Sequence, residues 1–153
     1  MRSRAHPPAL LALCAIVLIG LGLYFMLLRP PLLPEDVRYV GATSEQIGAI
    51  TPGFAEWITR VFWVLGGYIV ATGLLTLTIT RTSFRESSQR LSAVVAIAGL
   101  SSIGWMAAVN FLIDSDYKWP LLGVAALRLA AVTMAWIQSA ADRQADRRKE
   151  VAI

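Results

Sequence analysis

The stretch PALLALCAIVLIGLGLYFMLL, residues 8 to 28, decides the fold class of this chain. It contains no charged residue, and about 20 apolar residues in a helix cross a hydrocarbon core about 30 Å thick. A cleaved signal peptide is the competing interpretation, because Arg2 and Arg4 precede the stretch. However, the apolar stretch is long and no small-x-small cleavage site precedes Arg29. We therefore expect a first transmembrane helix.

Three further apolar segments follow, at about residues 61–80, 91–113 and 120–140. Of the 153 residues 56% are hydrophobic and 16% are charged, whereas soluble domains carry about 25% charged residues. The connections 81–90 and 114–119 are short, so the last three helices should be antiparallel neighbours. The sequence predicts a single domain over residues 1–153, an all-α, four-helix transmembrane bundle.

The basic residues predict the orientation of this bundle. With the N-terminus inside, nine basic residues lie on the inner side: Arg2, Arg4, Arg81, Arg85, Arg90, Arg143, Arg147, Arg148 and Lys149. Four lie on the outer side: Arg29, Arg38, Arg60 and Lys118. Because short cytoplasmic segments carry an excess of Lys and Arg, both termini are expected in the cytoplasm.

The outer loop, roughly 30 residues from Arg29 to Arg60, should contain short helical segments. It opens with RPPLLPED at residues 29–36, which the prolines predict to be extended rather than helical. Thr43 and Gln46 have the spacing of a capping box for a short helix. Thr51 followed by Pro52 is typical of the start of a longer helix that continues into the second transmembrane segment.

Arg128 is the residue that most needs an explanation, because it is a charge near the middle of the fourth apolar segment. Such a charge costs about 2.5 to 3.5 kcal/mol on insertion scales. Small residues on the same helical face, such as Ala125 and Ala131, predict that Arg128 faces the bundle. Since helical side chains tilt toward the N-terminus of their helix, its guanidinium should reach outward.

We expect Arg128 to join a polar cluster at the outer end of the third helix. Its other members would be Asn110, Asp114 and Asp116. A structural interpretation pairs Arg128 with Asp114, while a functional interpretation makes Arg128 the counter-charge of a bound anion or lipid headgroup.

Tyr68, Thr72, Thr76 and Thr80 recur every four residues and form a hydroxyl stripe along the second helix. A polar pathway is one interpretation of this stripe. The other is that each hydroxyl bonds back to the carbonyl one turn earlier or joins two helices.

The sequence lacks the residues that several classes of function require. The chain has one cysteine, Cys14, and one histidine, His6, which exclude an internal disulfide, a four-thiolate zinc site and bis-histidine haem ligation. No catalytic signature, phosphate-binding loop or dinucleotide-binding turn is present, so we predict no catalytic residues, cofactor or metal.

Glu35, Asp36 and Arg38 lie close together in the outer loop, where they could form a binding or metal-associated cluster, but such acids are usually just solvated. The net charge of +4 reflects basic residues that flank the apolar segments and set the membrane topology, so we expect no nucleic-acid-binding face.

The segment RVFWVLGGYIVATGLL, residues 60–75, follows an apolar first helix that ends near a proline. In this layout the chain resembles uncharacterised four-helix proteins of the bacterial inner membrane, including the DoxX-like class. The resemblance implies a location in that membrane and carries over no activity and no functional residues.

Two functions remain open from the sequence. The first is a structural or interaction role in the inner membrane, with lipids and a membrane protein or a second copy of the chain as partners. The alternative is a binder or transporter of a small anion or lipid that uses Arg128. An enzyme ranks third.

Overall fold

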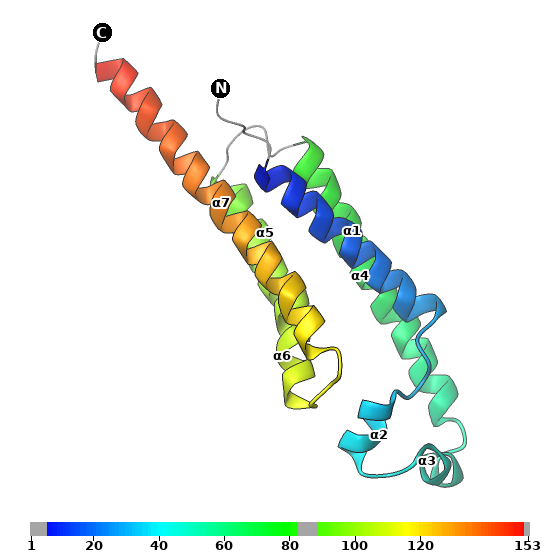
Figure 1. The fold of residues 1–153 in the computed structure, drawn as a ribbon. Coiled ribbons are helices and arrows are strands. Elements are labelled where there is room, and N and C mark those ends of the chain that lie inside the picture. The colour runs from blue at the N-terminus through cyan, green and yellow to red at the C-terminus, as the bar shows by residue number, and fades with distance from the viewer. Residues whose placement is uncertain (1–5, 83–88, 152–153) are drawn as a thin grey trace.

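The computed structural model describes residues 6–82 and 89–151, and every regular element within these two ranges is helical (Figure 1). The membrane-length elements are α1 (His6–Leu27), α4 (Phe54–Thr82), the consecutive α5 (Gln89–Gly99), η2 (Leu100–Gly104) and α6 (Trp105–Leu112), and α7 (Lys118–Val151). Four helical segments in the described ranges are long and apolar enough to cross a membrane. This confirms the prediction of an all-helical chain with four such helices.

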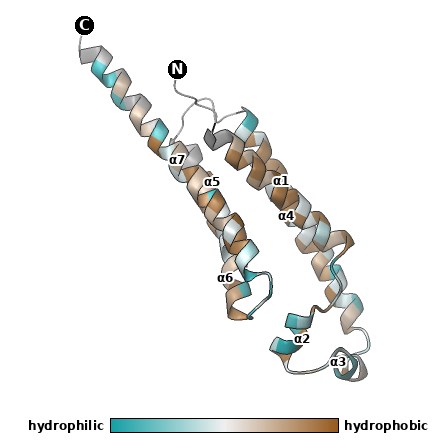
Figure 2. Cartoon of the chain, viewed as in Figure 1, coloured by the Kyte–Doolittle hydropathy of each residue, from teal (hydrophilic) through white to brown (hydrophobic). Residues whose placement is uncertain are grey.

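The antiparallel helices give the molecule two distinct ends. We call the end with α2 (Pro34–Val40), α3 (Ser44–Ile50) and the connection 113–117 the loop end. The opposite end, where α1 begins and α4 ends, is the terminal end, and α7 continues beyond it (Figure 1). Figure 2 shows hydrophobic residues along the four long helices and hydrophilic residues gathered at α2, at the connection 113–117 and along the last turns of α7.

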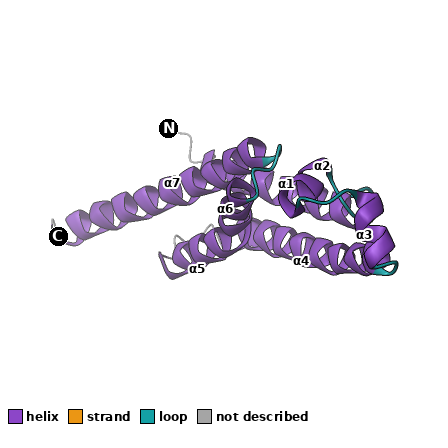
Figure 3. Cartoon of the chain, turned by 90° about the horizontal axis from the view of Figure 1, so that it is seen from below, coloured by secondary structure: helices purple, strands orange, loops and turns teal. Residues whose placement is uncertain are grey.

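The long helices pack as two pairs. α1 lies along α4, and α7 lies along α5, η2 and α6, while contacts between α1 and α7 join the pairs (Figures 1 and 3). The buried core nearer the loop end consists of Leu18, Ile69, Ile103, Ala107 and Leu121. The core nearer the terminal end consists of Leu11, Val95, Ala131 and Val132. Along α7, Arg128 lies between these two cores.

Glycines bring the backbones of α1 and α4 into close contact. A Cβ added at Gly22 would lie 2.6 Å from the carbonyl oxygen of Gly66, and a Cβ added at Gly66 would lie 2.6 Å from that of Gly22. A Cβ at Gly73 would lie 2.9 Å from the carbonyl oxygen of Ala15. Apolar side chains gain little by leaving lipid for another helix, so close packing of this kind is what holds membrane helices together.

Local sequence signals account for α2 and α3. The predicted capping box is confirmed, because Thr43 Oγ1 accepts from Gln46 N at 3.1 Å and Thr43 N donates to Gln46 Oε1 at 2.8 Å. The prediction that residues 29–36 are all extended is wrong, since α2 begins at Pro34. Proline is accepted in the first turn of a helix, where its missing N–H has no intrahelical partner.

The ends of the long helices also differ from the expected ones. The second segment was expected at 61–80, with a helix that starts near Thr51 and Pro52 and continues into it; α4 (Phe54–Thr82) confirms this continuous helix. The fourth was expected at 120–140, but α7 continues to Val151 because residues 141–151 contain neither proline nor glycine. The third, expected at 91–113, is interrupted by the π-helical turn η2, which was not predicted.

Candidate anion site at Arg128

Arg128 lies in the centre of the bundle, with only 3% of its surface exposed. Its Nη2 donates to Thr76 Oγ1 of α4 at 3.3 Å and to the carbonyl oxygen of Val95 of α5 at 3.5 Å, the limit for a hydrogen bond. Cys14 of α1 is fully buried and close enough to interact electrostatically with the guanidinium. Residues from the three other long helices therefore lie around this side chain of α7.

The hydrogen bonds of Arg128 leave part of the guanidinium unsatisfied. Its Nε and Nη1 are buried and have no hydrogen-bond partner in the part of the chain that the structure describes. The two acceptors on Nη2 are a hydroxyl and a carbonyl, both neutral, and no acidic side chain in the described ranges forms a salt bridge with Arg128. Because arginine stays protonated in proteins, the site keeps a positive charge that no described acid balances.

Gly99 makes the space for this side chain. A Cβ added at Gly99 would lie 2.4 Å from Arg128 Nε and 2.9 Å from Arg128 Cδ, so only glycine fits without displacing the arginine. The π-helical turn η2 begins at the next residue. Ser101 and Ser102 donate to carbonyls at this turn, with Ser102 Oγ 2.7 Å from the oxygen of Ala98. Such turns are frequent at functional sites.

The structure does not bring together the polar cluster expected from the sequence. Arg128 bonds to Thr76 and Val95, toward the terminal end, whereas Asn110 lies in the last turn of α6 and Asp114 and Asp116 lie in the connection 113–117 at the loop end. The tilt of the Cα–Cβ bond did not decide the direction of the guanidinium, because the gap at Gly99 accommodates the flexible part of the side chain.

The other three members of that expected cluster have partners of their own. Asn110 Nδ2 donates to the carbonyl oxygen of Met106 at 2.9 Å, and Asp116 pairs with Arg38 at 3.1 Å. Asp114 pairs with Lys118, which holds the pKa of that carboxyl below its ordinary value.

The backbone of Asp114 also ends a helix, and its φ of 52° lies in the left-handed region. Ser115 N donates to the carbonyl oxygen of Asn110, and Asp114 N donates to that of Phe111, which is the Schellman pattern at the end of a helix. Asp114 is therefore the residue that turns the chain out of α6.

Most of the hydroxyl stripe on α4 is satisfied within its own helix. Thr72 Oγ1 donates to the carbonyl oxygen of Tyr68 at 2.8 Å, Thr76 Oγ1 to that of Thr72 at 2.8 Å, and Thr80 Oγ1 to that of Thr76 at 2.7 Å. Tyr68 itself is exposed on the helix. Only Thr76 reaches the candidate site, where its oxygen also accepts from Arg128.

A cavity of about 230 Å³ lies against Arg128, between α7 and the α5–η2 segment. We call it the side groove; its lining includes Gly99, Leu100, Ile103, Leu122, Ala126, Arg128 and Leu129. Leu100 is 74% exposed and Leu129 is 65% exposed, so the groove opens sideways from the bundle. Among the described residues, Arg128 is the one charged side chain that lines it. In a bilayer this opening would face acyl chains.

Ion pairs and packing hold the loop end together. Arg29 pairs with Asp36 at 2.9 Å and stacks over the ring of Phe62 at 3.5 Å. Glu35 is buried and accepts from Ser115 Oγ at 3.2 Å, which ties α2 to the α6–α7 connection. No group of three or more potential metal ligands occurs among the described residues.

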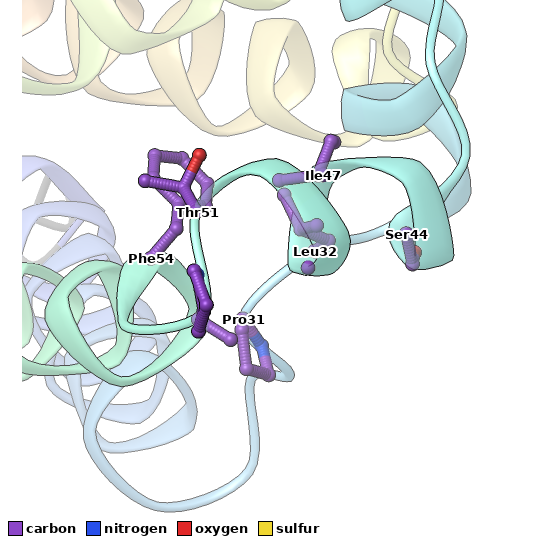
Figure 4. A pocket seen from close by; sticks show the side chains of 9 residues that line it. Pro31, Leu32, Ser44, Ile47, Thr51 and Phe54 are labelled. Carbon is purple, nitrogen blue, oxygen red and sulfur yellow. The ribbon is translucent and has the colours of Figure 1, made fainter.

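A second cavity, about 220 Å³, lies at the loop end between residues 31–32, α3 and the start of α4 (Figure 4). Among the residues that line it are Pro31, Leu32, Ile47 and Phe54, which are apolar. The cavity has no charged lining residue.

Sequence reasoning missed Gly99 and η2 as parts of the site. The run GLSSIG at residues 99–104, with two serines between two glycines inside an apolar helix, is the signal that points to them. A comparison with known proteins finds no family model, no curated protein and no solved structure that matches this chain.

Proposed function

We propose that this chain is a multi-pass protein of the bacterial inner membrane that binds an anionic group, a carboxylate or a phosphate, at Arg128. The observation that carries this proposal is the buried guanidinium, two of whose nitrogens, Nε and Nη1, have no hydrogen-bond partner and which has no paired acid among the described residues. Hydrogen bonds from a guanidinium to a carboxylate or phosphate are about twice as strong as those between neutral groups. A bound anion would supply both the missing acceptor and the missing charge.

The distribution of charge supports an orientation with both termini in the cytoplasm. Arg29, Arg38, Arg60 and Lys118 belong to the loop end, whereas Arg81, Arg147 and Arg148 of the larger basic group belong to the terminal end and to the α7 extension beyond it. Under the positive-inside rule the terminal end is cytoplasmic. The resemblance to uncharacterised four-helix inner-membrane proteins, including the DoxX-like class, agrees with this placement and is part of the proposal.

A structural or interaction role is the second candidate, and the bonds of Arg128 favour it. Through Thr76 and Val95 the side chain links α7 to α4 and α5, and so it would hold the two helix pairs together. In that role the bundle would pair with lipids, a membrane protein or a second copy of itself. Interhelical polar contacts in membranes average about 0.6 kcal/mol, which is less than the cost of an intramembrane arginine.

The stability of Arg128→Gln separates the two candidates. In nanodiscs of phosphatidylcholine without added anions, the anion-binding proposal expects this variant to be at least as stable as the wild type, because an unbalanced charge has been removed. Added acetate or inorganic phosphate should then raise the unfolding temperature of the wild type and not that of the variant. A ligand at 100 times its Kd stabilises by about 2.7 kcal/mol. The measurement is thermal unfolding followed by intrinsic tryptophan fluorescence.

Arg60→Gln is the control, because Arg60 is exposed and lies in α4 outside the site. It should respond to the anions as the wild type does. The structural role would instead be supported if Arg128→Gln lost stability in the absence of anions and neither protein responded to them.

A further inference from the structure

The position of the side groove shows what kind of ligand could reach Arg128. The guanidinium contacts Val95, six residues into the helix that starts at Gln89, so at 1.5 Å per residue it lies about 9 Å from the start of that helix. From there the groove follows Leu100, Ile103 and Leu122 toward the loop end. A lipid in the membrane leaflet at the terminal end would lie parallel to the groove, because its headgroup is near that end and its chain points toward the bilayer centre.

The chemistry of the groove is that of an acyl-chain site with a single charge at one end. Gly99, Gly104, Ala125 and Ala126 keep it wide, and its leucine and isoleucine side chains are apolar. Its volume of about 230 Å³ is below the roughly 300 Å³ at which pockets for drug-sized ligands begin. One narrow chain fits such a volume better than the two chains of a phospholipid.

We infer that the side groove takes the acyl chain of a single-chain anionic lipid, such as a fatty acid, whose headgroup binds Arg128. This inference rests on the proposed anion site and adds the ligand class and the route, which is sideways from the bilayer between α7 and the α5–η2 segment. Charge complementarity identifies the occupant, because Arg128 lines an otherwise apolar groove and its Nε and Nη1 are buried donors without acceptors among the described residues. An uncharged chain would leave both donors unpaired.

The test measures binding of dodecanoic acid to the purified protein in phosphatidylcholine nanodiscs at alkaline pH. Dodecanol supplies the chain without the charge, and acetate supplies the charge without the chain. Ala126→Phe fills the groove from its exposed rim, while Ala130→Phe places the same ring on an exposed position of α7 outside the lining. Arg128→Gln removes the charge.

Dodecanoate should bind the wild type and Ala130→Phe equally, and Ala126→Phe should weaken it by about tenfold, which corresponds to about 1.4 kcal/mol. Dodecanol should bind none of the proteins measurably. Unfolding temperatures without ligand verify that each variant is folded.

Two different failures can be told apart. If Ala126→Phe binds dodecanoate as the wild type does, or if dodecanol binds as well as dodecanoate, the acyl-chain inference is wrong while the anion site can stand. If acetate, phosphate and dodecanoate all act equally on the wild type and on Arg128→Gln, the anion site itself is wrong and the inference falls with it.

Discussion

At the scale of single residues, Arg128 is a permanent charge whose surroundings are neutral. Its hydrogen bonds to Thr76 and Val95 are long, and two of its nitrogens have no partner within residues 6–82 and 89–151. Removing one partner of a buried ion pair is costly because the other charge is left behind. In this protein the arginine already stands without a described acid, so its removal should relieve the bundle rather than weaken it.

Gly99→Ala tests whether the space at Gly99 positions Arg128. The new Cβ would lie 2.4 Å from Arg128 Nε, so the guanidinium must move and the variant should lose about 1 to 3 kcal/mol, as overpacked cores do. In combination with Arg128→Ala the loss should largely disappear, because the clashing atoms are gone. Thermal or denaturant unfolding of the four proteins of this double-mutant cycle provides the measurement.

Gly123→Ala is the control for this cycle, since a Cβ there meets nothing within 4 Å. It should be neutral or stabilising by up to about 1 kcal/mol, because alanine is the better helix former. Additive losses in the Gly99→Ala and Arg128→Ala cycle would contradict the proposed contact.

At the scale of elements, the pairing of α1 with α4 depends on backbone contact at Gly22 and Gly66. The neighbouring glycines Gly66 and Gly67 have opposite surroundings, since a Cβ at Gly66 would lie 2.6 Å from the backbone of α1 and one at Gly67 meets nothing within 4 Å. A single step along α4 therefore separates a packing position from a free one.

Gly66→Ala should destabilise the protein by about 1 to 3 kcal/mol, because the methyl group pushes two backbones apart. Gly67→Ala should be neutral or stabilising, because only helix propensity changes. Unfolding in a mixed micelle with increasing denaturing detergent would compare the two variants with the wild type. Equal stability of both variants would show that α1 and α4 do not approach each other this closely.

At the scale of the whole molecule, the two ends of the bundle differ in construction. The loop end is covered by α2, α3 and the connection 113–117, which are tied together by the Glu35–Ser115 hydrogen bond and the Arg38–Asp116 ion pair. At the terminal end α7 continues as a helix beyond the other elements (Figure 1). Part of this extension, at Arg147 and Arg148, is basic and exposed.

The proposed orientation places this basic extension in the cytoplasm. Single cysteines at Thr43 and Asp116 should react with a membrane-impermeant maleimide in intact spheroplasts, because both positions are exposed at the loop end. A cysteine at Ala145, exposed on the extension, should react only after permeabilisation. Cys14→Ser provides the background, and labelling is measured as a mass shift on a gel.

Ser115→Cys is the matched control beside Asp116, because Ser115 is buried and should stay unlabelled until the protein is denatured. Labelling at Ala145 in intact spheroplasts without labelling at Thr43 would reverse the orientation.

The sequence alone determined the helical class, the four membrane-length segments and the capping box at Thr43, because apolar length and caps depend on residues close together in the chain. The partners of Arg128 were decided only by the tertiary structure. Three flexible methylene groups separate its Cα from the guanidinium, so the direction taken depends on where another helix leaves room. That room is at Gly99, 29 positions earlier in the chain, beside the π-helical turn. Meanwhile Asp114, the partner expected from the sequence, pairs locally with Lys118.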